Sequence, residues 1–152
     1  MRVAAGFDHR GSHLREAVIG AIAAAGHEPV DLGVDTDAVR VDYPDIARNV
    51  GSAIREGRAE RGVLVCGSGV GASVAASKIP GIRAAICHDA YSAHQGVEHD
   101  DMNVLCLGSE VIGPELAAEL ARAFVTARFD GGKRYVRRLE KIEEMEREKT
   151  YG

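Results

Sequence analysis

The sequence of 152 residues predicts an α/β fold, in which a mostly parallel sheet of about five strands carries helices on both faces. Short apolar runs alternate along the chain with longer stretches in which apolar residues recur every three or four positions. Aliphatic residues dominate, only 5% of the residues are aromatic, and tryptophan is absent, which suits alanine-rich helices on a sheet better than a β-sandwich. No repeat or linker divides the chain, so we expect a single domain over residues 1–152.

The expected strands are the five short apolar runs at residues 2–7, 30–32, 62–66, 83–87 and 103–107. Helical periodicity marks segments 14–25, 46–54, 74–79 and 116–124. Ser12 is placed to cap the first helix, and Gly26 to end it. Because these elements form a series of strand–helix–strand units, we expect right-handed crossovers.

The chain changes character from Gly131 onward, where charged residues become dense. Within this tail an apolar stripe recurs at helical spacing, formed by Val136, Leu139, Ile142 and Met145. The pattern predicts a C-terminal amphipathic helix over residues 131–149 that packs across the domain or onto a second subunit. The alternative is a charged helix that only borders the surface.

Composition excludes several functional classes. A net charge of -4 argues against a general nucleic-acid binder, and no apolar run is long enough to span a membrane. The three cysteines lie in apolar runs without CxxC spacing, which predicts reduced thiols in a cytoplasmic protein rather than a zinc site. Three histidines, His88, His94 and His99, are spaced unlike any common set of metal ligands. We therefore expect no metal site.

The most informative segment is Cys66-Gly67-Ser68-Gly69-Val70-Gly71-Ala72. Cys66 ends an expected strand, and open α/β sheets bind ligands at the carboxyl ends of their strands. The glycines allow backbone N–H groups to face a bound anion, and these dipoles favour a thiolate that can act as a base. One alternative is a dinucleotide fingerprint with Asp89 about 20 residues later, although the motif follows the third strand rather than the first. Another is a structural turn beside a buried thiol.

Two further groups of residues are candidates for the same site. Asp8 and His9 follow the first strand and are suited to binding a polyol or phosphate or to acid–base chemistry, unless Asp8 only caps the next helix. Arg134 and Arg138 are four residues apart and can hold a phosphate, unless they pair with neighbouring glutamates. Residues 99–103, by contrast, are typical of a solvated turn before a strand.

Five blocks fit one pattern in order along the chain: Asp8-His9-Arg10-Gly11, Val41-Asp42-Tyr43-Pro44-Asp45, Cys66-Gly67-Ser68-Gly69-Val70-Gly71, Gly81-Ile82-Arg83-Ala84-Ala85 and residues 99–108. Together they resemble ribose-5-phosphate isomerase type B, a family that includes the galactose-6-phosphate isomerase subunits. The resemblance implies a three-layer, five-stranded Rossmann-like domain without cofactor or metal. It also implies a homodimer or homotetramer with active sites between subunits. The implied reaction is isomerisation of a small sugar phosphate, most directly ribose 5-phosphate to ribulose 5-phosphate in the pentose phosphate pathway.

The resemblance also implies a role for each matching residue. Cys66 would move the proton between carbons 1 and 2, and His99 of a neighbouring subunit would open the sugar ring. Ser68 and the loop amides would hold the enediolate oxygens, and Asp8 would support ring opening. The implied substrate-binding residues are His9, Gly67, Gly69, Val70, Gly71, Asp100, Arg134 and Arg138.

Two positions depart from the family pattern. Asp100 stands where asparagine is common, and Glu110 stands where an arginine often helps to bind phosphate. A carboxylate beside a phosphate dianion is repulsive, so these residues favour an alternative substrate such as a four-carbon or six-carbon aldose or its phosphate. A silent sugar-phosphate-binding module and a dinucleotide-binding domain are the non-enzymatic alternatives.

Overall fold

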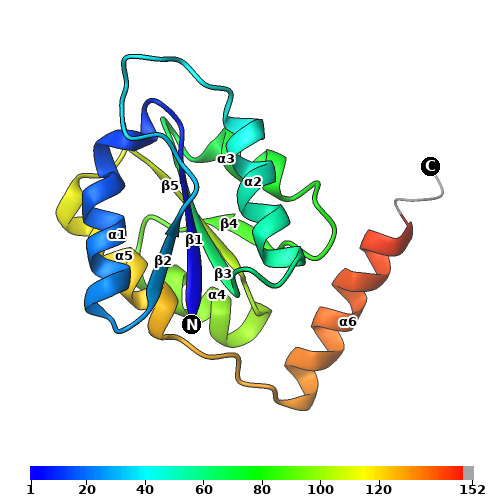
Figure 1. Cartoon of the computed structure of the whole chain (residues 1–152). Helices are drawn as coiled ribbons and strands as arrows, with labels where there is room; N and C mark the ends of the chain where they lie inside the picture. Colours follow the sequence, from blue (N-terminus) through cyan, green and yellow to red (C-terminus); the bar gives the residue numbers. More distant parts are fainter. Residues whose placement is uncertain (149–152) are drawn as a thin grey trace.

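The computed structural model describes residues 1–148 and places one sheet between two layers of helices (Figure 1). The sheet has five strands in the order β2-β1-β3-β5-β4, and every neighbouring pair is parallel. The strands are β1 (Arg2–Phe7), β2 (Glu28–Asp31), β3 (Arg61–Cys66), β4 (Ala84–Ile86) and β5 (Val104–Gly108). The predicted α/β, Rossmann-like fold with a five-stranded parallel sheet is therefore confirmed.

Within residues 1–148, six α-helices connect or follow the strands. They are α1 (Arg15–Ala24), α2 (Tyr43–Arg55), α3 (Val70–Ala76), α4 (Ala90–Asp100), α5 (Pro114–Thr126) and α6 (Lys133–Glu148). Helices α1, α4 and α5 share one buried apolar cluster with the sheet, while α2 and α3 share the other on the opposite face. Both faces of the sheet are covered, as parallel sheets require.

Local structure differs from the sequence prediction at two places. Ser12 does not cap α1, because it lies inside a 3₁₀ turn over Gly11–Leu14 and its hydroxyl donates to the carbonyl of His9 at 2.7 Å. The expected solvated turn at 99–103 is also wrong in its first part, since His99 and Asp100 form the last turn of α4. The polar residues of α4 mask its helical period, because only Ala93 and Val97 of this helix are buried.

The order of the strands creates a crevice at one edge of the sheet. The chain leaves β1 toward β2 on one side and later returns to β3 on the other, so the crossovers diverge between β1 and β3. Phe7 pairs with Val65, and Cys66 pairs with Gly108, so β1, β3 and β5 end at the same edge. Ligands bind at such a divergence, outside the carboxyl ends of the strands.

Helix α6 runs along the outside of the domain and contacts it near both of its ends (Figure 1). Tyr135 is its one buried residue within the described range, whereas Val136, Ile142 and Met145 of the predicted stripe are exposed. Near its far end, the Gly81 amide donates to a carboxylate oxygen of Glu146 at 2.9 Å. The helix is confirmed to residue 148, and Lys149 lies outside the described residues.

No helix within residues 1–148 is long and apolar enough to cross a membrane.

Candidate active site

A cavity of about 360 Å³ opens at the carboxyl edge of the sheet. It lies beside the ends of β1 and β3 and the first turns of α2 and α3. Its lining residues are Asp8, His9, Arg10, Tyr43, Cys66, Gly67, Ser68, Gly71 and Glu110. The structure thus brings together the predicted residues of the first strand and of the glycine loop, which are far apart in the sequence.

The glycine loop folds back over the Cys66 sulfur. Cys66 is the last residue of β3, and the loop turns at Gly69, whose φ of 83° lies in the left-handed region that favours glycine. In this turn the Gly69 amide donates to Cys66 Sγ at 3.2 Å, and the Val70 amide donates to Ser68 Oγ at 3.2 Å. The thiol therefore lies at the cavity wall with a backbone N–H group directed at it.

The segment after β5 holds this loop from the other side. Backbone hydrogen bonds of 2.9 Å run from Ser109 N to Cys66 O and from Glu110 N to Gly67 O. Gly108 is so close to the loop that a Cβ atom there would lie 2.6 Å from the backbone of Ser68. Glycine at position 108 is what permits this close approach of two backbones.

Asp8 and His9 are fixed by the turn that follows β1. Asp8 is buried, and one of its carboxylate oxygens accepts from the Gly11 amide at 2.7 Å. His9 Nδ1 accepts from the Val41 amide at 3.2 Å. A neutral His9 ring therefore carries its proton on Nε2 and can donate it to a ligand.

Three lining residues were not assigned to the site from the sequence: Arg10, Tyr43 and Glu110. The ring of Tyr43 lies on the first turn of α3, where a Cβ atom on Gly71 would come within 2.5 Å of the ring. Its position at the start of α2, directly after a long loop, was the available signal. Glu110 was noticed only as a departure from the family pattern.

The other predicted residues form a second group around Tyr135. The rings of His99 and Tyr135 stack with centroids 4.4 Å apart and planes 13° apart. The guanidinium carbons of Arg134 and Arg138 lie 4.7 and 6.0 Å from the centroid of the Tyr135 ring, at cation–π distance. Arg134 also donates to the Tyr135 hydroxyl at 2.5 Å. Tyr135 thus joins the three predicted residues, and sequence reasoning missed it.

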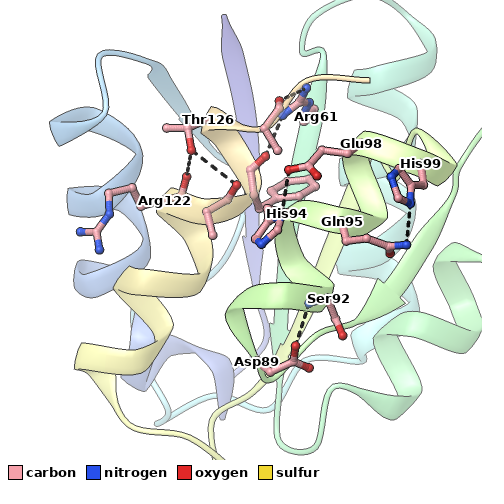
Figure 2. A network of polar contacts seen from close by, with 12 residues as sticks. Arg61, Asp89, Ser92, His94, Gln95, Glu98, His99, Arg122 and Thr126 are labelled. Carbon is pink, nitrogen blue, oxygen red and sulfur yellow. Dashed lines mark hydrogen bonds and ion pairs between the residues drawn. The ribbon is translucent and has the colours of Figure 1, made fainter. Parts of the chain in front are cut away.

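Figure 2 shows how His99 is held on α4. Gln95 Nε2 lies 2.8 Å from His99 Nδ1, and with the amide donating, a neutral His99 carries its proton on Nε2. In the same view Asp89 accepts from the Ser92 amide at 2.7 Å and so caps the N-terminus of α4. Asp89 therefore already has a structural role, which weakens the dinucleotide alternative.

The two groups lie at opposite edges of the sheet within one protomer. Strand β5 begins at Val104, beside Gly62, and ends at Gly108, beside Cys66. His99 precedes the start of β5, so about 13 Å of strand separates its end of the sheet from the thiol. Asp100 lines a different cavity, of about 540 Å³, between α6, α4 and β4. One protomer does not bring His99, Asp100, Arg134 and Arg138 to the Cys66 cavity.

The remaining cysteines are unsuited to act as bases. Burial raises the pKa of Cys87 to about 11, with the charge of Asp89 as a smaller cause. Burial also raises the pKa of Cys106 well above the ordinary range of a thiol. Both behave as small buried hydrophobic residues. Within residues 1–148, no cluster of three or more histidine, cysteine or acidic side chains is placed to hold a metal ion.

The chain has close relatives of known name. A family model described as ribose/galactose isomerase matches residues 3–142. The chain is 39% identical over 149 residues to ribose-5-phosphate isomerase B of Escherichia coli, covering 98% of this chain and 99% of that protein. It is 38% identical over 132 residues to D-erythrulose-4-phosphate isomerase of Pectobacterium atrosepticum, covering 87% of each.

A solved structure gives the same result. The type B ribose 5-phosphate isomerase from Trypanosoma cruzi matches with a TM-score of 0.93 and 42% identity, covering 97% of this chain and 99% of that one. The chain therefore belongs to the ribose/galactose isomerase family and is an aldose–ketose isomerase.

Proposed function

We propose that the protein interconverts ribose 5-phosphate and ribulose 5-phosphate through a cis-enediolate, with Cys66 as the base. The observation that carries this proposal is the Cys66 sulfur at the wall of a cavity, with the Gly69 amide 3.2 Å away. The thiolate removes the proton from carbon 2 while the carbonyl oxygen on carbon 1 takes up the negative charge. The thiol then returns the proton to carbon 1. The hydroxyl on carbon 2 gives up its proton and becomes the new carbonyl, while the oxygen on carbon 1 takes up a proton and becomes the new hydroxyl.

Polar groups around the thiol are suited to stabilise the enediolate. Gly67, Ser68 and Gly71 line one side of the cavity, and Asp8 and His9 supply hydrogen-bonding groups on the other. The predicted loop residues Gly69 and Val70 do not line it, and their amides already donate to Cys66 Sγ and Ser68 Oγ. Donors that are already oriented toward developing charge need no rearrangement during the reaction. Removal of one such donor from comparable sites costs about 3 kcal/mol of transition-state stabilisation.

A complete site requires a second copy of the chain, as a homodimer or a homotetramer. The cavity of one protomer contains two carboxylates, Asp8 and Glu110, yet the substrate carries a phosphate dianion. We propose that His99, Arg134 and Arg138 of a neighbouring protomer complete the site, with His99 as the ring-opening acid and the arginines on the phosphate. The exposed apolar residues of α6 support this assembly, because such a stripe is suited to packing against another subunit.

Glu110 favours one alternative substrate class. Its carboxylate lines the Cys66 cavity, where it repels a phosphate placed close to it. A relative that is 38% identical is named D-erythrulose-4-phosphate isomerase, so the second candidate reaction is isomerisation of a four-carbon sugar phosphate.

Two measurements test the proposed reaction. The first follows ketose formation from a panel of phosphorylated and free aldoses with four, five and six carbons, and we expect the highest kcat/KM with ribose 5-phosphate. The second follows exchange of substrate carbon-bound hydrogen in deuterated water, which the Cys66→Ala variant should lose while it keeps its fold by circular dichroism. Near-normal exchange in this variant would remove Cys66 as the base, and a preference for a four-carbon substrate would support the alternative.

A further inference from the structure

Arg10 brings a permanent positive charge to the Cys66 cavity. Its side chain lies over the first residue of the glycine loop: a Cβ atom on Gly67 would be 3.0 Å from Arg10 Cδ and 3.1 Å from Arg10 Nη1. Arg10 is also exposed, so its guanidinium forms part of the rim of the cavity rather than its floor. The missing side chain at Gly67 is what makes room for the arginine there.

The backbone that carries Arg10 is firmly held. The Ser12 amide donates to the carbonyl of Asp8 at 2.9 Å, and the Ser12 hydroxyl donates to the carbonyl of His9. The Gly11 amide donates to the Asp8 carboxylate. The arginine therefore extends from a fixed turn beside the mouth of this cavity.

The Arg10 guanidinium is not paired with a carboxylate in the part of the chain that the structure describes. Within residues 1–148 its guanidinium forms no ion pair and no hydrogen bond, although two carboxylates line the same cavity. The Asp8 carboxylate already accepts from the Gly11 amide, and Glu110 lies beyond ion-pairing distance of the guanidinium. An exposed, unpaired guanidinium at a cavity mouth is available to hold an anionic group in bidentate fashion.

The charges that line the cavity favour a phosphate placed close to this arginine. Asp8 and Glu110 are the two acidic residues that line the cavity, and Arg10 is its one arginine. A phosphate dianion would meet net repulsion at this surface unless it lay beside Arg10 and away from Glu110.

We propose that Arg10 is the protomer's own phosphate-binding residue, and that Glu110 directs the phosphate toward it. This assignment rests on the proposed function, because it takes the ligand to be a sugar phosphate whose reacting carbons lie beside Cys66. Arg10 at the rim thus binds the phosphate, while the loop amides deeper in the cavity serve the reacting oxygens. Arg10 and Glu110 together also determine the preference for phosphorylated over free sugars, because a free sugar has no phosphate for Arg10 to bind.

The first test compares Arg10→Met, Arg10→Lys and a matched control, Arg122→Met, which removes an exposed arginine on α5 (Figure 2). A charge-assisted hydrogen bond changes affinity by about tenfold to a hundredfold. We expect Arg10→Met to raise KM for ribose 5-phosphate by about that factor with little change in kcat. KM for free ribose should stay constant, Arg10→Lys should restore part of the loss, and Arg122→Met should match the unchanged protein.

The Glu110→Gln variant should change KM for ribose 5-phosphate in the opposite direction to Arg10→Met. Removal of its negative charge should lower KM for ribose 5-phosphate and leave KM for free ribose unchanged. Equal changes for both sugars, in this variant or in Arg10→Met, would overturn the assignment.

The second test does not depend on turnover. Inorganic phosphate should protect Cys66 from alkylation by iodoacetamide, and Arg10→Met should raise the half-protecting concentration about tenfold or more. Unchanged protection in Arg10→Met, or no protection in the unmodified protein, would contradict a phosphate site at Arg10. Protection that depends on Arg10 in a protein that isomerises no sugar would instead keep the phosphate site and reject the proposed reaction.

Discussion

Gly11 lies flat against the carbonyl group of Val65, so that a Cβ atom on Gly11 would come within 2.6 Å of the Val65 carbonyl carbon and nearer still to its oxygen. This contact ties the turn after β1 to the strand that ends in Cys66. The Asp8 amide reinforces it with a hydrogen bond of 3.3 Å to the same carbonyl. The distance between the Asp8–His9 turn and the thiol is thus set by two backbones in direct contact.

The Gly11→Ala variant should lose both stability and activity. The added methyl group collides with backbone, which cannot move aside as a flexible side chain can, and overpacking of this kind costs about 1–3 kcal/mol or more. Urea unfolding at constant pH measures the loss. The matched control is Gly20→Ala, because position 20 is exposed in α1 with nothing within 4 Å of a new Cβ atom. That change should stabilise the protein by about 0.5–1 kcal/mol, and equal effects at both positions would contradict this account.

Alkylation should distinguish the three cysteines. Their exposed fractions are similarly small, at 4% for Cys66, 5% for Cys87 and 0% for Cys106, so exposure alone does not separate them. Only Cys66 lines the carboxyl-edge cavity described above, and the raised pKa values of Cys87 and Cys106 keep those two thiols protonated at pH 8. Iodoacetamide at pH 8 should therefore modify Cys66 first, as peptide mass spectrometry can show. Faster modification of Cys106 than of Cys66 would mean that the interior is open to reagent.

Stability should fall as the pH is lowered through the ordinary titration range of histidine. Burial lowers the pKa of His88 below 6.5, and His88 Nε2 accepts from the Gly108 amide at 3.0 Å. Between the folded and unfolded pKa values the unfolded chain binds more protons, so the free energy of unfolding rises with pH in that window and declines toward acid. His27 adds to the same trend, because burial and the neighbouring N-terminal ammonium group lower its pKa.

Urea unfolding at several pH values from 8 to 5 measures this slope, and the His88→Gln variant isolates one contribution. Glutamine can accept from the Gly108 amide without titrating, so this variant should show a shallower slope while retaining the native fold. An unchanged slope in His88→Gln would assign the acid sensitivity to other groups.

The exposed stripe on α6 gives a prediction about assembly. Ile142 and Met145 are exposed beside the cavity of about 540 Å³, so a charge placed on either should prevent a second subunit from covering them. We expect Ile142→Asp to shift the protein from an oligomer to a monomer in sedimentation velocity with no loss of helical circular dichroism. Lys141→Asp places the same carboxylate one position away on the charged side of the helix and should leave the assembly intact. A monomeric unmodified protein would contradict the proposed shared site.

The sequence was sufficient to predict the sheet, because its three central strands, β1, β3 and β5, are buried and read as nearly continuous apolar runs. Cys66 and Asp8 were found as well, since each directly follows or ends a strand at the ligand-binding edge. The separation of His99 from Cys66 also follows from sequence order, because His99 precedes an expected parallel strand whose other end lies beside Cys66. The contact of α6 with His99 through Tyr135 could not be read from the sequence.

The periodicity of apolar residues also could not predict individual side-chain contacts at the site. Tyr135 was not identified, because one aromatic residue in a charged helix carries no signal of the ring against which it stacks. Arg10 was passed over for a related reason. An exposed arginine in a turn is common and does not by itself indicate a binding site. The position of Arg10 at the cavity depends on the absence of a side chain at Gly67, which follows a different strand.

The placement of the two predicted groups at opposite edges of the sheet has a genetic consequence. A chain with Cys66→Ala keeps an intact His99 end, and a chain with His99→Ala keeps an intact Cys66 end. Suppose that each active site of a dimer combines Cys66 of one protomer with His99 of the other. A mixed dimer of the two inactive variants then contains one active site in which both residues are native. Two different loss-of-function alleles could then complement each other within a single cell, whereas two copies of either allele could not.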